Sequence, residues 1–530
     1  MVTINTGTSI LNAGSGIAAD GHAAGASAVT GTDLPTDQVY QPAGFGSTVQ
    51  IVVAASWTGT PATPQAAIVT PGTTTPVTGT AWQNIPGGSG TITAPAGGPY
   101  SLAFQDAYSG VQWRSSKNFF VGQCWGIYGQ SNAGYWEMPG NQVEISLTPV
   151  NARTRRQNGG GWFVVSAANS DVAHYSTPYP WTAQAGDICV FNGEAPGIFA
   201  DQILAITGNP VGLHWYEQFG EPATYFDPAT GAGWNAMVGN GAATGAWNNP
   251  SYAFDLQGII RIQGESDTGN STLIAAFPGH LSAELAAWKV KTGRSDGSFK
   301  FGVCSLGPQS GYPGTQSGNF GLLRAAQIAW VDANTSAGAF YAGNPIDVRL
   351  RDGEVHWYDV DEDRMAKRFA LTATIAAGAT VSGSAGAFVT GAGPRITGYV
   401  QSGATITASL AMDGATALVM GDGSTTGANI VSGNSFQFFT SGGGAVAPTA
   451  SAFSGSNIVF TFADTPTAAS VVTAQHCMAD APYGMSGYNA GTSPVTPGSP
   501  VLSAIPYGNN IVPGDTIGLP IWPHGPMAVT

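Results

Sequence analysis

Ser131 stands where a serine could act as a nucleophile. An apolar run, residues 121–128, leads directly into Gly129-Gln130-Ser131-Asn132. If that run is a parallel strand, the turn places the Ser131 hydroxyl at the carboxyl end of a sheet, where open α/β sheets bind ligands. A base could then activate the hydroxyl, and the backbone N–H of Ser131 could face an oxyanion. A serine after a glycine is also an ordinary turn residue, so this segment alone does not identify a nucleophile.

Gln263 and Glu265 follow a second apolar run, residues 258–262. The amide of Gln263 offers donors of the kind that stabilise a tetrahedral oxyanion, and the carboxylate of Glu265 can hold neighbouring loops by accepting hydrogen bonds. Standing alone, such a glutamine is more often structural than catalytic.

His356 is the candidate base, because it comes shortly after Asp352-Gly353-Glu354. A carboxylate there can accept the imidazole N–H, fix the tautomer and leave the other ring nitrogen facing the serine. We favour Asp352, since a short acid in a glycine-containing turn can reach the ring. Glu354 is the alternative, and a Ser–His pair without a third member is the remaining option.

Together the three segments occur in the order Ser, Gln, Asp and His, each at the end of a predicted strand or in a loop. That order supplies a nucleophile, an oxyanion donor and an oriented base. They also resemble the sialate O-acetylesterase family of the SGNH hydrolases, over most of the chain. The matching segments are residues 97–100, 120–125, 129–132, 211–213, 219–222, 263–267, 324–327, 346–347, 356, 368–371 and 518–520.

The resemblance implies a division of roles. Ser131 would be the nucleophile, His356 the base, and Gly220 and Gln263 would join the Ser131 N–H in the oxyanion hole, with Asn132 and Glu265 in support. The implied reaction removes acetyl groups from sugar hydroxyls through an acetyl-enzyme, without a metal or organic cofactor.

Two departures from the family pattern predict a different pocket shape and substrate. Ala133 stands where the family usually has methionine, and Arg261 where an aromatic residue is common. The position three residues before His356, the usual place of the acid, is Gly353.

Alternating strand-like and helical patterns over residues 119–378 predict an α/β fold, an SGNH-like three-layer domain with a mostly parallel sheet. The predicted strands are residues 119–128, 258–262 and 301–306. The predicted helices are residues 280–290, 322–331 and 361–375, the last with an acidic run at residues 359–363 that suits a helix N-terminus.

β-sandwich-like domains are predicted on both sides, at residues 49–118 and 379–530, where short apolar stretches alternate with Gly and Pro clusters. Residues 1–48, rich in Gly, Ala, Ser and Thr, are expected to form an arm for assembly or anchoring. The alternatives are a disordered tail or an edge extension of the next domain.

The net charge of the chain argues against some classes of binding partner. A net charge of −14 with only 9% charged residues disfavours nucleic acid and anionic lipid, because like charges repel. The four cysteines, Cys124, Cys189, Cys304 and Cys477, show no zinc spacing; they are interpreted as buried thiols, with one disulfide left open.

Residues 1–25 show no pattern of a signal peptide. The sequence also contains no run of 18 apolar residues, as a membrane-spanning helix would require. We therefore expect an extracellular or virion-associated protein that acts on an acetylated glycan. The rival hypothesis is a virion tail or surface protein that binds glycans adhesively, with or without esterase activity and as a homo-oligomer or part of a virion.

Overall fold

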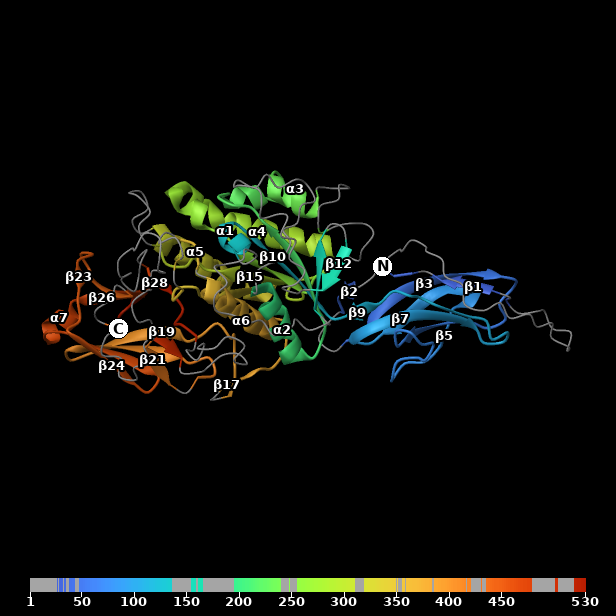
Figure 1. Cartoon of the computed structure of the whole chain (residues 1–530). Helices are drawn as coiled ribbons and strands as arrows, with labels where there is room; N and C mark the ends of the chain where they lie inside the picture. The colour runs from blue at the N-terminus through green and yellow to red at the C-terminus, as the bar shows by residue number, and fades with distance from the viewer. Residues whose placement is uncertain are drawn as a thin grey trace.

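A computed structural model describes most of the chain. The described residues are 26, 28–31, 33–34, 38–42, 47–135, 154–158, 161–164, 195–239, 247, 255–309, 319–348, 350, 355–357, 359–383, 386–415, 417–420, 430, 435–478, 501–503 and 519–530. Figure 1 shows an α/β region in the middle, N-terminal strands on one side and C-terminal strands on the other.

The middle region is built on a seven-stranded sheet in the order β12-β11-β13-β10-β14-β15-β16. Its strands are β10 (Gln123–Gly129), β11 (Thr154–Asn158), β12 (Gly161–Val164), β13 (Val211–Glu217), β14 (Gly258–Ile262), β15 (Lys300–Cys304) and β16 (Ala339–Gly343). All neighbouring pairs are parallel except β11 with β12. The predicted mostly parallel sheet is therefore confirmed.

Helices cover both faces of this sheet. Its strands are buried on both sides, so alternate residues contribute to two separate cores. One core joins the strands to α3 (Ala232–Val238), α4 (Ser271–Thr292) and α5 (Asn319–Asn334). The other joins them to α2 (Ala195–Thr207) and α6 (Asp359–Ala376). The region thus has three layers.

Two expected boundaries were wrong for identifiable reasons. The predicted strand at residues 119–128 is two strands, β9 (Phe119–Val121) and β10, in different sheets. They separate at Gly122, where a Cβ atom would lie 1.9 Å from the Pro210 carbonyl oxygen. α4 begins well before residue 280 because the Asn270 side chain accepts from Leu273 N, and the helix continues through Pro278.

The N-terminal strands form two sheets. One has the order β1-β3-β6, and the other β2-β9-β7-β4-β5 with β8 beside β7. Their bounds are β1 (Ala28–Gly31), β2 (Val39–Tyr40), β3 (Val49–Thr58), β4 (Pro64–Val69), β5 (Gln83–Asn84), β6 (Ser89–Ala94), β7 (Gly97–Asp106) and β8 (Gln112–Arg114), with a 3-10 turn η1 at Pro86–Gly88. Both sheets contribute to one apolar core.

Part of the predicted arm belongs to these sheets. β1 pairs with β3 antiparallel and β2 pairs with β9 parallel, and Val29, Leu34 and Tyr40 are buried. Residues 1–25 lie outside the described residues, so the assembly role of the arm stays a prediction.

The C-terminal strands form two four-stranded antiparallel sheets over one core, in the orders β19-β20-β25-β24 and β23-β22-β26-β28. The bounds are β19 (Arg395–Ser402), β20 (Thr405–Ala411), β22 (Phe436–Thr440), β23 (Ala445–Val446), β24 (Ala450–Ser454), β25 (Asn457–Thr461), β26 (Val471–His476) and β28 (His524–Ala528). Smaller elements are β17 (Ser382–Gly383), β18 (Gly386–Ala387), β21 (Leu418–Met420), β27 (Val501–Ser503) and α7 (Thr465–Ala469).

Cys124, Cys304 and Cys477 are buried free thiols, whereas Cys189 lies outside the described residues. Among the described helices, none is both long and apolar enough to span a bilayer.

Candidate active site

Ser131 begins the short helix α1 (Ser131–Tyr135), directly after β10. Gly129 is required before it, because a Cβ atom there would lie 1.7 Å from the Ile262 carbonyl oxygen of β14. That oxygen instead accepts a hydrogen bond from Gln130 N at 3.1 Å. The close approach brings the Ser131 turn against the end of β14, at the carboxyl edge of the parallel sheet, as the sequence predicted. Ser131 is only 5% exposed.

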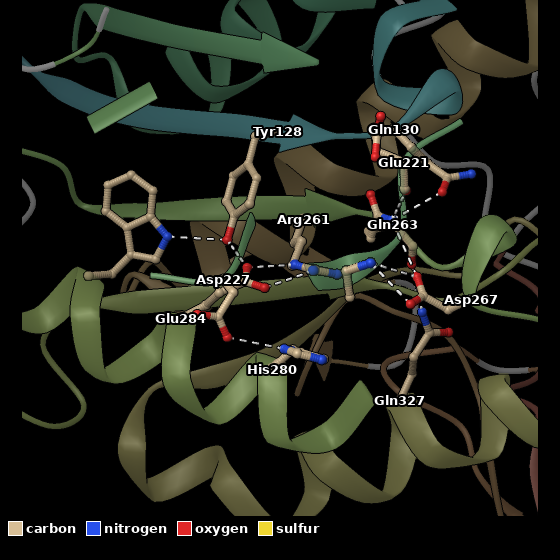
Figure 2. Close-up of polar contacts among 12 residues, drawn as sticks. Tyr128, Gln130, Glu221, Asp227, Arg261, Gln263, Asp267, His280, Glu284 and Gln327 are labelled. Atoms are coloured by element: carbon tan, nitrogen blue, oxygen red, sulfur yellow. Dashed lines mark hydrogen bonds and ion pairs between the residues drawn. The ribbon is translucent and has the colours of Figure 1, made fainter. Parts of the chain in front are cut away.

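Gln263 continues from β14 and ties three segments together (Figure 2). Its Nε2 lies 2.7 Å from the Glu221 carbonyl oxygen, 3.0 Å from Gln130 Oε1 and 3.4 Å from an Asp267 carboxylate oxygen. A backbone carbonyl can only accept, so the amide orientation is fixed. With two hydrogens and three acceptors, Nε2 has no hydrogen left for a bound oxyanion in this arrangement. The observed contacts make Gln263 a positioning residue, and its predicted donor role stays a prediction.

Gly220 lies in the loop that Gln263 contacts, between β13 and the 3-10 turn η4 (Ala223–Phe226). Its φ of +73° favours glycine, and the residue is exposed. Asp267 holds the same loop, because both of its carboxylate oxygens lie 3.0 Å from Ala223 N. Figure 2 shows Asp267 beside Gln263.

Asn132 brings the histidine segment to the serine turn. Its Nδ2 donates to the Val355 carbonyl oxygen at 3.2 Å, and its Oδ1 accepts from Trp357 N at 3.2 Å. Both backbone neighbours of His356 therefore bond to the residue next to Ser131. A bridge between Leu350 and Trp357 closes the loop that contains His356, which is half-buried.

An ion pair holds the residues that follow β16 against α6. Asp347 forms a two-pronged ion pair with Arg368 of α6, at 2.6 and 2.8 Å. Burial acts to raise the pKa of Asp347, but the charges of Arg368 and Arg364 bring it below its ordinary value. Asp347 is therefore ionised at neutral pH, and the pair fixes the start of the histidine loop.

Glu265 accepts a hydrogen bond from Asn132 Nδ2, which matches its predicted role in holding loops. Burial raises the pKa of Glu265, while its own backbone N–H, the Asn132 amide and the charge of His356 oppose that rise. Through Asn132, the Glu265 carboxylate and the backbone on both sides of His356 are held next to Ser131.

Arg261 corrects one expectation from the sequence. Its side chain is 1% exposed and forms a two-pronged ion pair with Glu284 of α4, at 2.6 and 2.7 Å. The Tyr128 hydroxyl also donates to Glu284 (Figure 2), and Trp288 Nε1 lies 3.2 Å from that hydroxyl. Ala133 is likewise fully buried, in the core between the sheet and α2 and α6. Arg261 and Ala133 are therefore core residues rather than parts of a pocket wall.

The two candidate acids, Asp352 and Glu354, lie outside the described residues, so the choice between them stays open. Sequence reasoning assigned no role to Gln130 or Asp267, although both stand inside the Gly-Gln-Ser-Asn and Gln-Gly-Glu-Ser-Asp segments. Gln130 Oε1 accepts from Gln263 and from Ser266 N, at 3.0 and 3.2 Å. Within the described residues, no three His, Cys, Asp or Glu side chains gather as metal ligands would.

A hydroxyl, an imidazole and a glycine loop at one sheet edge form a set that is suited to acyl transfer. No family model matches the sequence, and no curated protein matches it either. Among solved structures, the chain is similar to a carbohydrate acetylesterase from Xanthomonas citri, with 17% identity, a TM-score of 0.55, and coverage of 93% of this chain and 98% of that one.

Two other matches are weaker. One is an Arabidopsis thaliana protein, with 12% identity and a TM-score of 0.34 over 48% of this chain and 98% of that one. The other is a carbohydrate esterase family 2 enzyme with a carbohydrate binding domain from Corynascus thermopiles, with 12% identity and a TM-score of 0.30 over 66% of this chain and 94% of that one. The likeness to the Xanthomonas citri carbohydrate acetylesterase, at 17% identity, establishes a shared fold over 93% of this chain.

Proposed function

We propose that this chain is a serine esterase of the SGNH type that removes O-acetyl groups from a carbohydrate. The observation that supports it best is the contact of Asn132 with both backbone neighbours of His356, at 3.2 Å each, beside Ser131. The shared fold with a carbohydrate acetylesterase agrees with this proposal.

In the proposed mechanism His356 removes the proton from Ser131 Oγ, which attacks the acetyl carbonyl carbon. The oxyanion accepts hydrogen bonds from the backbone N–H groups of Ser131 and Gly220, and from Gln263 if its amide releases a protein acceptor. His356 then protonates the sugar oxygen, the sugar leaves, and an acetyl group remains on Ser131. Water attacks this ester with His356 again as base, and acetate is released.

Asp352 or Glu354 orients the His356 ring in this scheme, and no metal or organic cofactor takes part. We propose an acetylated polysaccharide or sialate as the substrate. The charge of −14 favours a neutral acetylated polymer over an anionic one, because the field of the protein repels anions.

The test is acetate release from p-nitrophenyl acetate and from acetylated polysaccharide. Ser131→Ala should lower kcat/KM by about 10³-fold or more. Ser266→Ala is the matched control, because the contact of Ser266 with Gln130 is through its backbone N–H. Equal rates for wild type and Ser131→Ala would remove the proposal. Glycan affinity without turnover would support the adhesive rival instead.

A further inference from the structure

A groove with a volume of 620 Å³ lies between the end of β3, the loop at residues 59–63 and the β5–η1 turn. Residues that line it include Trp57, Thr60, Pro61, Pro64, Asn84 and Pro86. A volume of this size suits a small ligand or a few units of a polymer.

The groove is remote from the candidate active site. In β7, Gly97 pairs with Val121, which lies just before β10. At the other end of the strand, Asp106 pairs with Pro64, which lines the groove. Asp106 comes nine positions after Gly97 in this strand, which is about 30 Å at the usual rise per residue. Figure 1 accordingly shows the N-terminal strands extending away from the α/β region. A ligand here would therefore contact the protein at a second place.

The walls of the groove are held in position by the fold. The buried Asp106 accepts from Thr63 N at 2.8 Å, and Ala107 N donates to the Thr63 carbonyl oxygen at 3.0 Å. On the other side Gly88 has a φ of +83°, and a Cβ atom there would lie 2.7 Å from Trp57 Nε1. Glycine at this position lets the turn pack directly on the indole. A groove that exists before binding costs little ordering entropy when it is filled.

A row of side-chain amides crosses the sheet and ends at the groove. Gln112 donates to Gln105 at 2.9 Å, Gln105 donates to Gln65 at 2.7 Å, and Gln65 donates to Asn84 at 3.0 Å. The row ends at the exposed Asn84, whose amide carries both a donor and an acceptor at the edge of the groove.

We propose that this groove binds a neutral glycan. Of the described residues that line it, none is ionisable, so a charged ligand would find no counter-charge. The indole and the prolines offer apolar surface to the C–H faces of a pyranose ring, and the Asn84 amide and threonine hydroxyls match its hydroxyl groups. This binding goes beyond the proposed esterase function: it would hold a polymer to the protein at a distance from Ser131.

The test is electrophoresis of the full chain, as the Ser131→Ala variant, in native gels that contain one polysaccharide each. The neutral probes are xylan, galactoglucomannan, mixed-linkage β-glucan and dextran, and the anionic probes are polygalacturonate and polysialic acid. Because the assay measures binding without turnover, it can fail while the esterase proposal stands, and the reverse.

We expect at least one neutral probe to retard the protein and neither anionic probe to do so. Asn84→Ala and Ala62→Glu change exposed positions in the groove and should each weaken retardation by about fivefold or more. Tyr108→Ala, which removes a 44% exposed aromatic outside the lining residues, is the matched control. Unchanged melting temperatures would show that the variants fold.

Three results would overturn the proposal. They are no retardation by any neutral probe, retardation by an anionic probe alone, and equal retardation of the two groove variants and the control.

Discussion

The Asn132 amide contacts the backbone on each side of His356 and the carboxylate of Glu265. One side chain next to the candidate nucleophile therefore holds both the backbone around the candidate base and the Glu265 carboxylate. Since the serine and histidine come from segments more than 200 residues apart, their relative position depends on such cross-links. A displacement of about 1 Å in a catalytic pair can cost about 10²-fold in rate.

Asn132→Ala should therefore lower kcat by about 10²-fold and leave KM nearly unchanged, because the Val355 and Trp357 backbone groups lose their partner. Steady-state kinetics on p-nitrophenyl acetate would measure this. A change in KM alone would mean that Asn132 serves substrate binding rather than the position of His356.

The buried Glu265 should make stability depend on pH. Burial raises the pKa of Glu265 in the folded state. At a pH between the ordinary pKa and the raised pKa, the carboxyl is therefore protonated in the folded state and ionised in the unfolded state. Its contribution to stability is present below the ordinary pKa and is lost as pH rises through the raised one. Urea unfolding of wild type and Glu265→Gln from about pH 4 to 8 should show that the free energy of unfolding of the variant increases relative to that of wild type as pH rises. The opposite trend would mean that the pKa of Glu265 is lowered.

The sequence was informative about these residues to different degrees. Ser131, His356 and Glu265 could be singled out as candidates because each follows a strand-like run or stands in a motif with chemical meaning, and their roles stay predictions. The contact of Gln130 with Gln263 and that of Asp267 with Ala223 could not be predicted, because in each case the two residues lie more than 40 positions apart in sequence and meet only in the folded sheet. The predicted donor role of Gln263 did not foresee that Glu221 and Gln130 would occupy its amide hydrogens.

At the scale of elements, the loop between β13 and η4 depends on the turn that follows β14. Gln263 contacts Glu221 of that loop, and Asp267 contacts Ala223. Gly264 makes the turn, with a φ of +142° and the Leu323, Gln327 and Leu306 side chains 3.1 to 3.2 Å from where a Cβ would be. The loops that follow β13 and β14, the strands on either side of β10, thus form one unit around Gly220.

Asp267→Asn should weaken the contact between the two loops. One carboxylate oxygen is replaced by an NH₂ group, which cannot accept a hydrogen bond from Ala223 N or Gln263 Nε2. We expect kcat/KM to fall by about tenfold or more. Asp227→Asn is the matched control just after η4, because Asp227 also accepts backbone N–H groups, from Ala229 and Thr230, but forms no hydrogen bond with Ala223 or Gln263. Equal losses in both variants would count against a specific role for Asp267.

Elements with continuous apolar runs were predictable, since a parallel strand buried on both faces has no polar side. This held for β14 and β15 and for the central parts of α4, α5 and α6. The prediction missed the first turns of α4, where Asn270 caps the helix and Pro278 lies within it. β13 was recognised only through a resemblance and not as a strand.

At the scale of the whole molecule, the α/β region and the C-terminal sheets share a tight contact at α5. The buried Arg324 donates to the Leu306, Gly307 and Cys477 carbonyl oxygens at 2.7 to 3.0 Å. One turn away, a Cβ atom on Gly321 would lie 1.6 Å from the Met478 carbonyl oxygen. The sequence placed β structure after residue 378 but contained no signal for this contact, because a close approach of backbones has no local pattern.

Gly321→Ala should therefore destabilise the protein, by about 1 to 3 kcal/mol, since the Met478 backbone has to move. Gly279→Ala is the matched control, because it adds the same methyl group to an exposed helical position with no atom within 4 Å. Urea unfolding should show a loss for the first variant and none for the second. Equal stability of both would mean that the two regions separate easily.

The nucleophilic role of Ser131 is tested most directly by its reaction with diisopropyl fluorophosphate, followed by mass spectrometry of the digested protein. We predict one adduct per chain, on Ser131, which is absent from Ser131→Ala and forms far more slowly in His356→Ala. An adduct on another residue, or the same labelling of the Ser131→Ala variant, would contradict the account.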